Sequence, residues 1–242
     1  MAADDAAKKP ARKSKRRKGW IIAMDGPAGV GKSTVGHLVA KDLGYHFINT
    51  GEMFRALTWK ALEQKLDLQD QDGVLAFAKG LKWEFRPTEE GTTLKTFIDG
   101  QGVTTQIRDE NVSKNSSVVA ANPGVRKFLC KLQRKLGQAG GIVMEGRDIT
   151  THVFPDADLK IYLDASVDER ADRRYRQLKA QGHDADRQKI KEAILTRDLN
   201  DLKRKINPLT QAADAVVIDS TSLSLHEVAA SILKTIRAGH GR

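Results

Sequence analysis

The feature that most constrains the fold is a glycine-rich loop at residues 26–33, which reads Gly-Pro-Ala-Gly-Val-Gly-Lys-Ser. It follows a short apolar run and precedes a stretch with helical periodicity. Glycines allow successive backbone N–H groups to point at phosphate oxygens, and the start of a helix adds positive potential. The spacing therefore predicts a loop that binds the phosphates of a nucleoside triphosphate, although it does not by itself give the reaction.

Two residues of this loop, Lys32 and Ser33, have side chains that can take part directly in binding the phosphates and their metal. Lys32 is placed to reach the β- and γ-phosphates, and the Ser33 hydroxyl is placed to ligate Mg²⁺. The alternative, a glycine-rich turn without a ligand, is disfavoured because the full pattern arises by chance in about one chain in a hundred of this length. The residues of this segment that are predicted to bind the triphosphate are Gly26, Pro27, Ala28, Gly29, Val30, Gly31, Lys32, Ser33 and Thr34.

Short apolar runs alternate with longer helical stretches along most of the chain. Continuous apolar runs are typical of strands buried on both faces, and helices between them favour parallel pairing with right-handed crossovers. The sequence therefore predicts an α/β fold with a five-stranded parallel sheet. The predicted strands are 20–25, 45–48, 141–145, 159–164 and 215–219, and the predicted helices are 32–43, 54–66, 112–121, 123–136, 167–180, 189–203 and 225–237.

The pattern changes between residues 79 and 107, where shorter strand-like runs replace the helices. These runs lie at 83–86, 93–98 and 101–103. Asp99-Gly100, between the last two runs, is a strong hairpin signal. We interpret this segment as a small antiparallel β insert within the α/β chain.

Charge is distributed unevenly between the N-terminus and the rest of the chain. Residues 1–19 carry eight lysines and arginines against two aspartates, so they contribute +6 of the net charge of +10. We expect this segment to be a disordered basic tail, which more simply aids solubility than contacts nucleic acid. The chain has no apolar run long enough for a membrane helix, and its single cysteine, Cys130, allows no internal disulfide. We therefore expect a cytoplasmic protein without membrane contact, and a monomer.

Candidate residues for a second substrate follow the second and third predicted strands. Thr50 and Arg55 come after the second strand, and Arg147 and Asp148 come after the third. Ligands bind along this carboxyl edge of the sheet in open α/β folds. A cation in the first turn of a helix opposes the helix dipole, and a phosphate bound to Arg55 would remove that conflict. Surface arginines and a local ion pair are the alternatives here.

Arg197, Asp201 and Arg204 are spaced i, i+4, i+7 and therefore share one face of a predicted helix. Taken alone, this triplet is typical of a solvated helix with a salt bridge. A phosphate-binding role is a second interpretation, because the chain holds several other candidate phosphate-binding arginines.

Arg170 and Arg173 share a face of the preceding predicted helix. We expect the segment after them to be mobile and assign a lid to residues 174–190. A lid that closes over ATP excludes water and prevents wasteful hydrolysis.

The sequence has no pairing of histidines that suggests acid–base catalysis and no cysteine–histidine cluster for a metal. Phosphoryl transfer to a nucleoside monophosphate needs no general base, because its nucleophile is an already ionised phosphate oxygen. Catalysis then reduces to positioning and charge neutralisation. Many arginines without a catalytic histidine therefore favour a nucleoside monophosphate kinase.

Together these residues resemble the bacterial-type cytidylate kinase family, from about Trp20 to the C-terminal helix. The resemblance implies a three-layer P-loop kinase domain at 20–242, with the β insert in the monophosphate-binding region and a helical lid. It implies ATP-dependent phosphorylation of CMP, and of dCMP, to the diphosphate by direct in-line transfer with Mg²⁺. The motifs that carry it are 26–34, 49–51 with Arg55, Ser117 with Arg126, 145–148, 153–157, 163–166, 169–174, 197–204 and 212–221.

The resemblance also implies a role for each candidate residue. Ser117 and Asp148 resemble the acceptors of the cytosine amino group, and Arg126 resembles the donor to the ring. Uracil would present a carbonyl to Asp148 instead, and this mismatch should cost selectivity. The other implied roles are phosphate contacts and catalysis by Lys32, Arg55, Arg147 and Arg204, a substrate contact at Thr50, a ribose contact at Asp201 beside Arg197, ATP contacts at Arg170 and Arg173, and Mg²⁺ held directly by Ser33 and through water by Glu145.

The chain departs from the family pattern beside these residues. Glu52 stands where the family usually has a small residue, Phe54 where tyrosine is common, and residues 150–152 read Thr-Thr-His in place of a usual Gly-Thr-Val. We expect these changes to affect affinity or the range of acceptors without removing a residue that the chemistry needs.

Two other classes of function remain open from the sequence. The first is a P-loop kinase for UMP, AMP or a small alcohol, although the Asp-Gly-Phe-Pro-Arg stretch expected of an adenylate kinase is absent. The second is a nucleotide-binding regulator or RNA-associated protein that uses its basic tail. Non-catalytic binding would not need Lys32, Arg55, Arg147 and Arg204 together, which argues against the second class.

Overall fold

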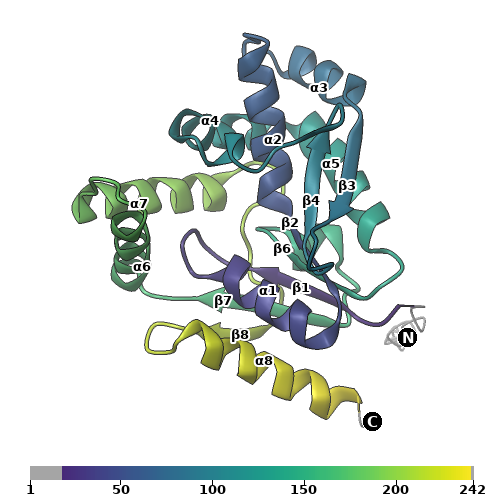
Figure 1. The fold of residues 1–242 in the computed structure, drawn as a ribbon, viewed down its shortest axis with the longest axis vertical. Coiled ribbons are helices and arrows are strands. Elements are labelled where there is room, and N and C mark those ends of the chain that lie inside the picture. Colours follow the sequence, from purple (N-terminus) through teal and green to yellow (C-terminus); the bar gives the residue numbers. More distant parts are fainter. Residues whose placement is uncertain (1–17, 241–242) are drawn as a thin grey trace, which may run out of the picture.

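A computed structural model describes residues 18–240, so the predicted basic tail lies almost wholly outside the described residues. At its centre is a five-stranded sheet in the order β2-β6-β1-β7-β8, in which every pairing is parallel (Figure 1). The predicted five-stranded parallel sheet is therefore confirmed. Its strands are β1 (Ile21–Asp25), β2 (His46–Asn49), β6 (Ile142–Glu145), β7 (Leu159–Asp164) and β8 (Val216–Asp219).

The central strand β1 is buried on both faces, which explains its unbroken apolar sequence. Ile22 and Met24 pack into the core cluster shared with α1 (Lys32–Leu43) and α8 (Leu225–His240). Ile21 and Ala23 pack into a second cluster on the opposite face, against α5 (Pro123–Gly137) and the π-helical turn η2 (Ile149–Val153). Helices on both faces of the sheet give the predicted three layers.

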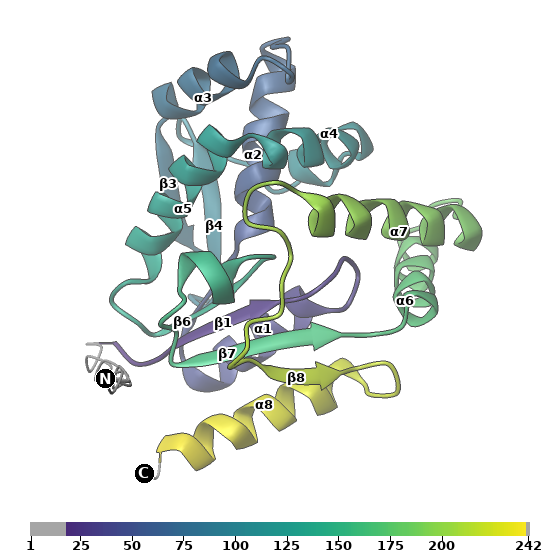
Figure 2. The same cartoon turned by 180° about the vertical axis from the view of Figure 1, so that it is seen from behind.

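A region rich in helices rises above the β2–β6 side of the sheet (Figures 1 and 2). It contains the three-stranded antiparallel sheet β3-β4-β5, so the predicted insert is confirmed. Asp99 and Gly100 both have positive φ, 51° and 78°, as the hairpin signal requires. The elements of this region are α2 (Thr50–Glu63), α3 (Gln71–Gly80), β3 (Trp83–Pro87), β4 (Leu94–Ile98), β5 (Gln101–Gly102), the 3₁₀ turn η1 (Gln106–Arg108) and α4 (Glu110–Ala121).

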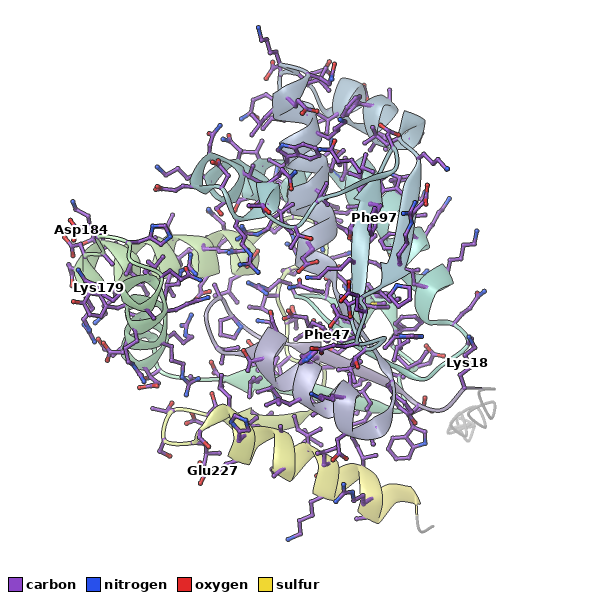
Figure 3. The ribbon with its side chains drawn as sticks, in the orientation of Figure 1. Lys18, Phe47, Phe97, Lys179, Asp184 and Glu227 are labelled. Carbon is purple, nitrogen blue, oxygen red and sulfur yellow. The ribbon has the colours of Figure 1, made fainter. Side chains whose placement is uncertain are left out.

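The helices α6 (Val167–Ala180) and α7 (Arg187–Lys203) pack together as an arm on the same side of the molecule as α4 (Figure 2). Lys179 and Asp184 pair at 3.3 Å at its outer end (Figure 3). In the part of the chain that the structure describes, no helix has the length and apolar character to cross a membrane.

Most predicted helix bounds agree with the structure to within a few residues, but three elements, α3, η1 and η2, were not predicted. The helix α3 is only ten residues long and begins at the Asp70 cap, whose carboxylate accepts from the Gly73 N–H. The turn η2 depends on long-range hydrogen bonds described below, which no local pattern reports.

Candidate active site

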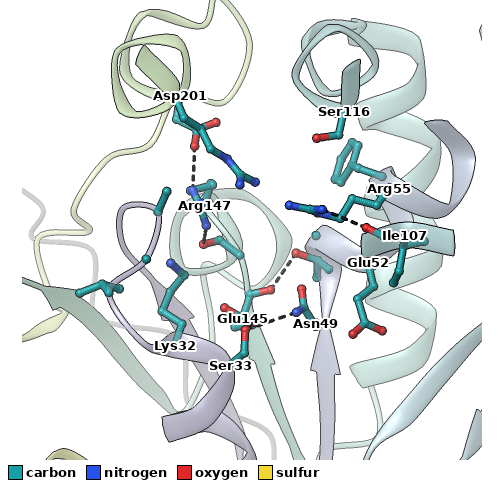
Figure 4. Close-up of a pocket in the computed structure, with 18 of the residues that line it drawn as sticks. Lys32, Ser33, Asn49, Glu52, Arg55, Ile107, Ser116, Glu145, Arg147 and Asp201 are labelled. Carbon is teal, nitrogen blue, oxygen red and sulfur yellow. Dashed lines mark hydrogen bonds and ion pairs between the residues drawn. The ribbon is translucent and has the colours of Figure 1, made fainter. Parts of the chain in front are cut away.

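A cavity of about 770 Å³ lies above the carboxyl ends of β1, β2 and β6, between the helical region and the arm (Figure 4). Helices α2 and α4 contribute one wall, and α6 and α7 contribute the other. The predicted site residues that line it are Ala28, Gly29, Val30, Gly31, Lys32, Ser33, Thr34, Thr50, Arg55, Ser117, Arg126, Glu145, Arg147, Asp148, Arg173, Arg197, Asp201 and Arg204.

The phosphate-binding loop depends on glycine where the backbone turns most sharply. Gly26 has φ of 150°, and a Cβ at this position would lie 2.0 Å from the Leu163 carbonyl oxygen. Gly26 and Pro27 do not line the cavity, but their carbonyl oxygens accept hydrogen bonds from Lys32 Nζ at 2.8 and 2.7 Å. The loop thus holds the lysine by its own backbone.

Lys32 is a buried cation, with 5% of its surface exposed. Burial, and next the nearby positive charge of Arg147, lower its pKa to about 7. The two carbonyl oxygens are its hydrogen-bond partners, and no carboxylate pairs directly with it among the described residues. A polyphosphate in the cavity would supply the missing negative charge.

Arg170, which was predicted to contact ATP, holds the loop from behind and does not line the cavity in this structure. Arg170 is buried, and its Nη1 donates to Asp198 Oδ2 at 2.5 Å and to the Ala28 carbonyl at 2.9 Å. The other oxygen of Asp198 accepts from the Ala28 N–H at 3.0 Å. This buried pair therefore anchors both backbone polar groups of Ala28, its N–H and its carbonyl, to the arm.

Arg173 reaches the loop from the cavity side. Its Nη1 donates to the Val30 carbonyl at 3.1 Å, and Nη2 donates to the Leu223 carbonyl at 3.3 Å. Arg174 and Arg176 of the same helix also line the cavity. The arm thus presents three arginines toward the space above the loop.

Ser33, Asn49 and Glu145 meet at the floor of the cavity (Figure 4). The Ser33 hydroxyl donates to Glu145 Oε1, and Asn49 Nδ2 donates to the same hydroxyl at 3.4 Å. Thr50 Oγ1 donates to the Glu145 carbonyl at 2.7 Å, so Thr50 orients the end of β6. The sequence analysis placed Asn49 in a motif at this edge of the sheet but assigned it no role.

The oxygen donors at this point fit the needs of a hard cation. Mg²⁺ binds through one or two carboxylates, waters and substrate phosphates, without a cage of protein ligands. Ser33 and Glu145 supply one hydroxyl and one carboxylate. Among residues 18–240 no cluster of three His, Cys, Asp or Glu side chains could hold a metal by itself. The site therefore fits a metal that arrives with phosphate.

Four arginines converge on the middle of the cavity from three elements. Arg55 of α2 donates to the Ile107 carbonyl at 2.9 Å and to Ser113 Oγ at 2.6 Å. Arg147, after β6, donates to Asp201 Oδ2 at 2.8 Å. These partners hold the guanidinium groups in fixed positions before any ligand binds. The other two arginines are Arg197 of α7 and Arg204, which directly follows α7.

The concentration of positive charge is visible in the pKa values. Burial lowers the pKa of Arg197 to about 10, and Arg147 and Arg55 add to the effect. Burial likewise lowers the pKa of Arg204 to about 10, with Arg126 as the next cause. The Arg197 guanidinium makes no hydrogen bond or ion pair with any residue in the described range, although Arg197 lines the cavity. Such a group is prepared for an anion.

The far end of the cavity is formed by Arg126, Asp148, Ser117 and Phe54. Arg126 Nη2 lies 2.7 Å from Asp148 Oδ2, and its guanidinium stands over the Phe54 ring at 5.3 Å. Arg126 is 5% exposed, and its Nε is buried without a hydrogen-bond partner in the described structure. An unpaired buried donor next to a fixed carboxylate is unusual unless a ligand completes it.

Asp25, which no motif singled out, holds the backbone that follows Asp148. Its carboxylate accepts from the Ile149 N–H at 3.0 Å, from the Thr150 N–H at 2.8 Å and from Thr150 Oγ1 at 2.6 Å. Burial raises the pKa of Asp25. The departure at Thr150 therefore adds a donor to a buried carboxylate and supports the turn η2.

The departure at Glu52 lies on the cavity wall beside Lys95, with 3.9 Å between Glu52 Oε1 and Lys95 Nζ. Burial raises the pKa of Glu52, and Lys95 opposes that shift. The Glu52 carboxylate thus joins Glu145, Asp148 and Asp201 in a cavity whose lining is otherwise rich in lysine and arginine.

The chain resembles known proteins over nearly all of its described length. The family model described as Cytidylate kinase matches residues 22–238. The chain is 46% identical over 215 residues to a cytidylate kinase of Bacillus velezensis, covering 89% of this chain and 95% of that protein. It is 45% identical over 217 residues to a cytidylate kinase of Pediococcus pentosaceus, covering 90% and 95%. A solved shikimate kinase from Acinetobacter baumannii matches with a TM-score of 0.45 and 15% identity, covering 92% of this chain and 96% of that one.

Proposed function

This chain belongs to the cytidylate kinase family, and from that premise we propose that it phosphorylates CMP, and dCMP, at the expense of ATP. The observation that carries the proposal is the continuity of one cavity, which is lined at one end by Lys32 and at the other by Arg126 and Asp148. Two nucleotides entering from opposite ends would bring their phosphates together among the arginines.

ATP is the proposed ligand of the loop at 26–34. The backbone N–H groups and Lys32 would bind its phosphates, and Arg173 would contact it from the arm. Closure of the lid at 174–190 would exclude water from the γ-phosphate. Arg170 would act indirectly, because it anchors the Ala28 peptide of this loop.

The base of the acceptor is proposed to bind at Arg126, Asp148 and Ser117. The cytosine amino group would donate to Asp148 and Ser117, and the unpaired Nε of Arg126 supports a donor role toward the ring acceptors. Uracil would present a carbonyl in place of the amino group, and two acceptors would then face each other. This contact is the proposed source of the preference for CMP over UMP.

The acceptor phosphate is proposed to lie among Arg55, Arg147 and Arg204, and its ribose near Asp201 and Arg197. An ionised phosphate oxygen needs no base, so the chain would act by aligning it with the γ-phosphorus for an in-line displacement. The fixed guanidinium groups would neutralise charge that accumulates in the transition state. Mg²⁺, held by Ser33 directly and by Glu145 through water, would supply further neutralisation of the phosphates when bound.

The test is ADP formation measured with CMP, dCMP, UMP, AMP and GMP as acceptors, in the wild type and in Asp148→Asn. We expect CMP and dCMP to be preferred in the wild type. The variant should lower kcat/KM for CMP by about 10²-fold, as expected when a buried acceptor is replaced by an amide that can also donate, and should improve UMP relative to CMP. In Asp148→Asn the KM for ATP should change by less than about threefold, because Asp148 lies at the end of the cavity away from Lys32.

Asp72→Asn is the matched control, because Asp72 is an exposed aspartate on α3 that does not line the cavity. Equal wild-type rates with CMP and UMP would contradict the cytosine assignment. An equal loss of ATP and CMP affinity in Asp148→Asn would contradict its role in reading the base.

A further inference from the structure

Asn207 contacts both the base end and the phosphate end of the site, although it does not line the cavity. Its side-chain Nδ2 donates to Asp148 Oδ2 at 3.1 Å. Its backbone carbonyl accepts a hydrogen bond from Arg204 Nη2. One residue of the segment between α7 and β8 thus ties the base-end carboxylate to an arginine of the phosphate region.

The backbone of Asn207 is held in an uncommon conformation. Its φ is 49°, in the left-handed region where asparagine is tolerated better than most residues. It also precedes Pro208, which restricts the conformation of the residue before it. Hydrogen bonds fix the chain around it, since the Leu209 N–H donates to the Asp201 carbonyl at 2.9 Å. An uncommon conformation persists where the surroundings over-determine it, and such positions gather at functional sites.

The two carboxylate oxygens of Asp148 differ in their hydrogen bonds. Arg126 and Asn207 both donate to Oδ2, at 2.7 and 3.1 Å. No residue in the described part of the chain donates to Oδ1 of Asp148. Two donors on one oxygen fix the plane of the carboxylate and leave the second oxygen as an acceptor on the cavity wall. The Asn207 amide adds its hydrogen bond without adding a second positive charge next to the base.

We infer that Asn207 is a positioning residue for the recognition of cytosine, acting through Asp148, and that it couples this recognition to the placement of Arg204. The inference rests on the proposed function. Without the amide, the Asp148 carboxylate rotates about the single Arg126 contact, so the acceptor for the cytosine amino group is less well directed. Without the carbonyl in its left-handed position, Arg204 loses an anchor at the phosphate.

The side-chain and backbone contributions are separable by choice of variant. Asn207→Gly removes the amide and keeps the left-handed backbone accessible, so the carbonyl stays in place for Arg204. Asn207→Asp keeps the shape and the tolerance of positive φ but faces Asp148 with a like charge. For Asn207→Gly we expect KM for CMP to rise about fivefold, a fraction of the tenfold or more typical of losing a hydrogen bond to a charged group directly. For Asn207→Asp we expect a rise of about tenfold or more.

The readout is a split between kinetic parameters, measured with CMP, UMP and ATP, together with the melting temperature. The inference predicts a higher KM for CMP, a smaller ratio of kcat/KM for CMP over UMP, and an unchanged KM for ATP in Asn207→Gly. A wild-type KM and a wild-type CMP preference in Asn207→Gly would overturn it, and so would a uniform loss for both nucleotides that follows a lower melting temperature. Phosphorylation of CMP by the wild type is measured first. Its absence would contradict the proposed function and not the role of Asn207.

Discussion

The buried lysine of the phosphate-binding loop leads to a prediction about protons. Lys32 has a pKa of about 7 in the nucleotide-free chain because burial and Arg147 disfavour its charge. At pH 8 about nine-tenths of the chains would therefore hold a neutral Lys32, from the definition of a pKa. The phosphates of MgATP favour the charged form, so binding should return the pKa toward its ordinary value.

The magnitude follows from these two states. Close to one proton, about 0.9, should be taken up per ATP bound at pH 8, and about 0.1 at pH 6, where Lys32 is already charged. Arg197 and Arg204, whose pKa values are lowered to about 10, remain charged at both pH values and contribute little. Phosphates, with a second pKa near 6, are almost fully ionised at pH 8.

The assay is isothermal titration calorimetry of MgATP binding in two buffers of different ionisation enthalpy, repeated at pH 6 and pH 8. The difference between the two apparent enthalpies gives the number of protons taken up. Lys32→Met, which cannot be protonated, is the control and should lose the uptake at pH 8. Uptake below about 0.2 protons in the wild type at pH 8, or equal uptake in Lys32→Met, would refute the reasoning.

Two further predictions concern stability. Arg170→Met should lower the free energy of unfolding by about 3–5 kcal/mol, because Asp198 is left buried without its cation, and a urea titration that gives less than about 1 kcal/mol would contradict the role of this pair. The unfolded chain keeps the Lys32 proton up to its ordinary pKa of 10.5, while the folded chain releases it above about 7. The unfolded state thus binds more protons between these values, so stability should rise from pH 7 to about pH 8.5 in the wild type relative to Lys32→Met. Urea midpoints that move in parallel for the two proteins over this window would exclude a lowered pKa at Lys32.

The fold was predictable from the sequence where local pattern and tertiary structure agree. The strand at 21–25 is apolar throughout because both of its faces are buried, and the Asp99-Gly100 hairpin is set by two adjacent residues with positive φ. The loop at 26–33 was predictable for the same reason, because the types and spacing of its glycines, lysine and serine by themselves indicate phosphate binding. These features need no knowledge of distant contacts.

The parts that sequence did not predict depend on contacts between distant residues. Arg170 looked like a residue of the ATP site because it lies in the arginine-rich helix α6, but its position on that helix directs it to Asp198 and away from the cavity. The roles of Asp25 and Asn207 come from partners 125 and 59 positions away, at Thr150 and Asp148. A motif records residue types at fixed spacing, so it cannot report an acceptor that folding brings from elsewhere.

The central claim is that a set of fixed cations gathers two phosphate groups between the loop and the base end of one cavity. A crystal structure with a bisubstrate analogue, adenosine and cytidine joined through five phosphates, tests it most directly. The account predicts that the guanidinium groups of Arg55, Arg147 and Arg204 lie within hydrogen-bond distance of the phosphate chain, with the cytosine against Asp148. Phosphates bound elsewhere, with these three arginines still held only by protein partners, would contradict the account.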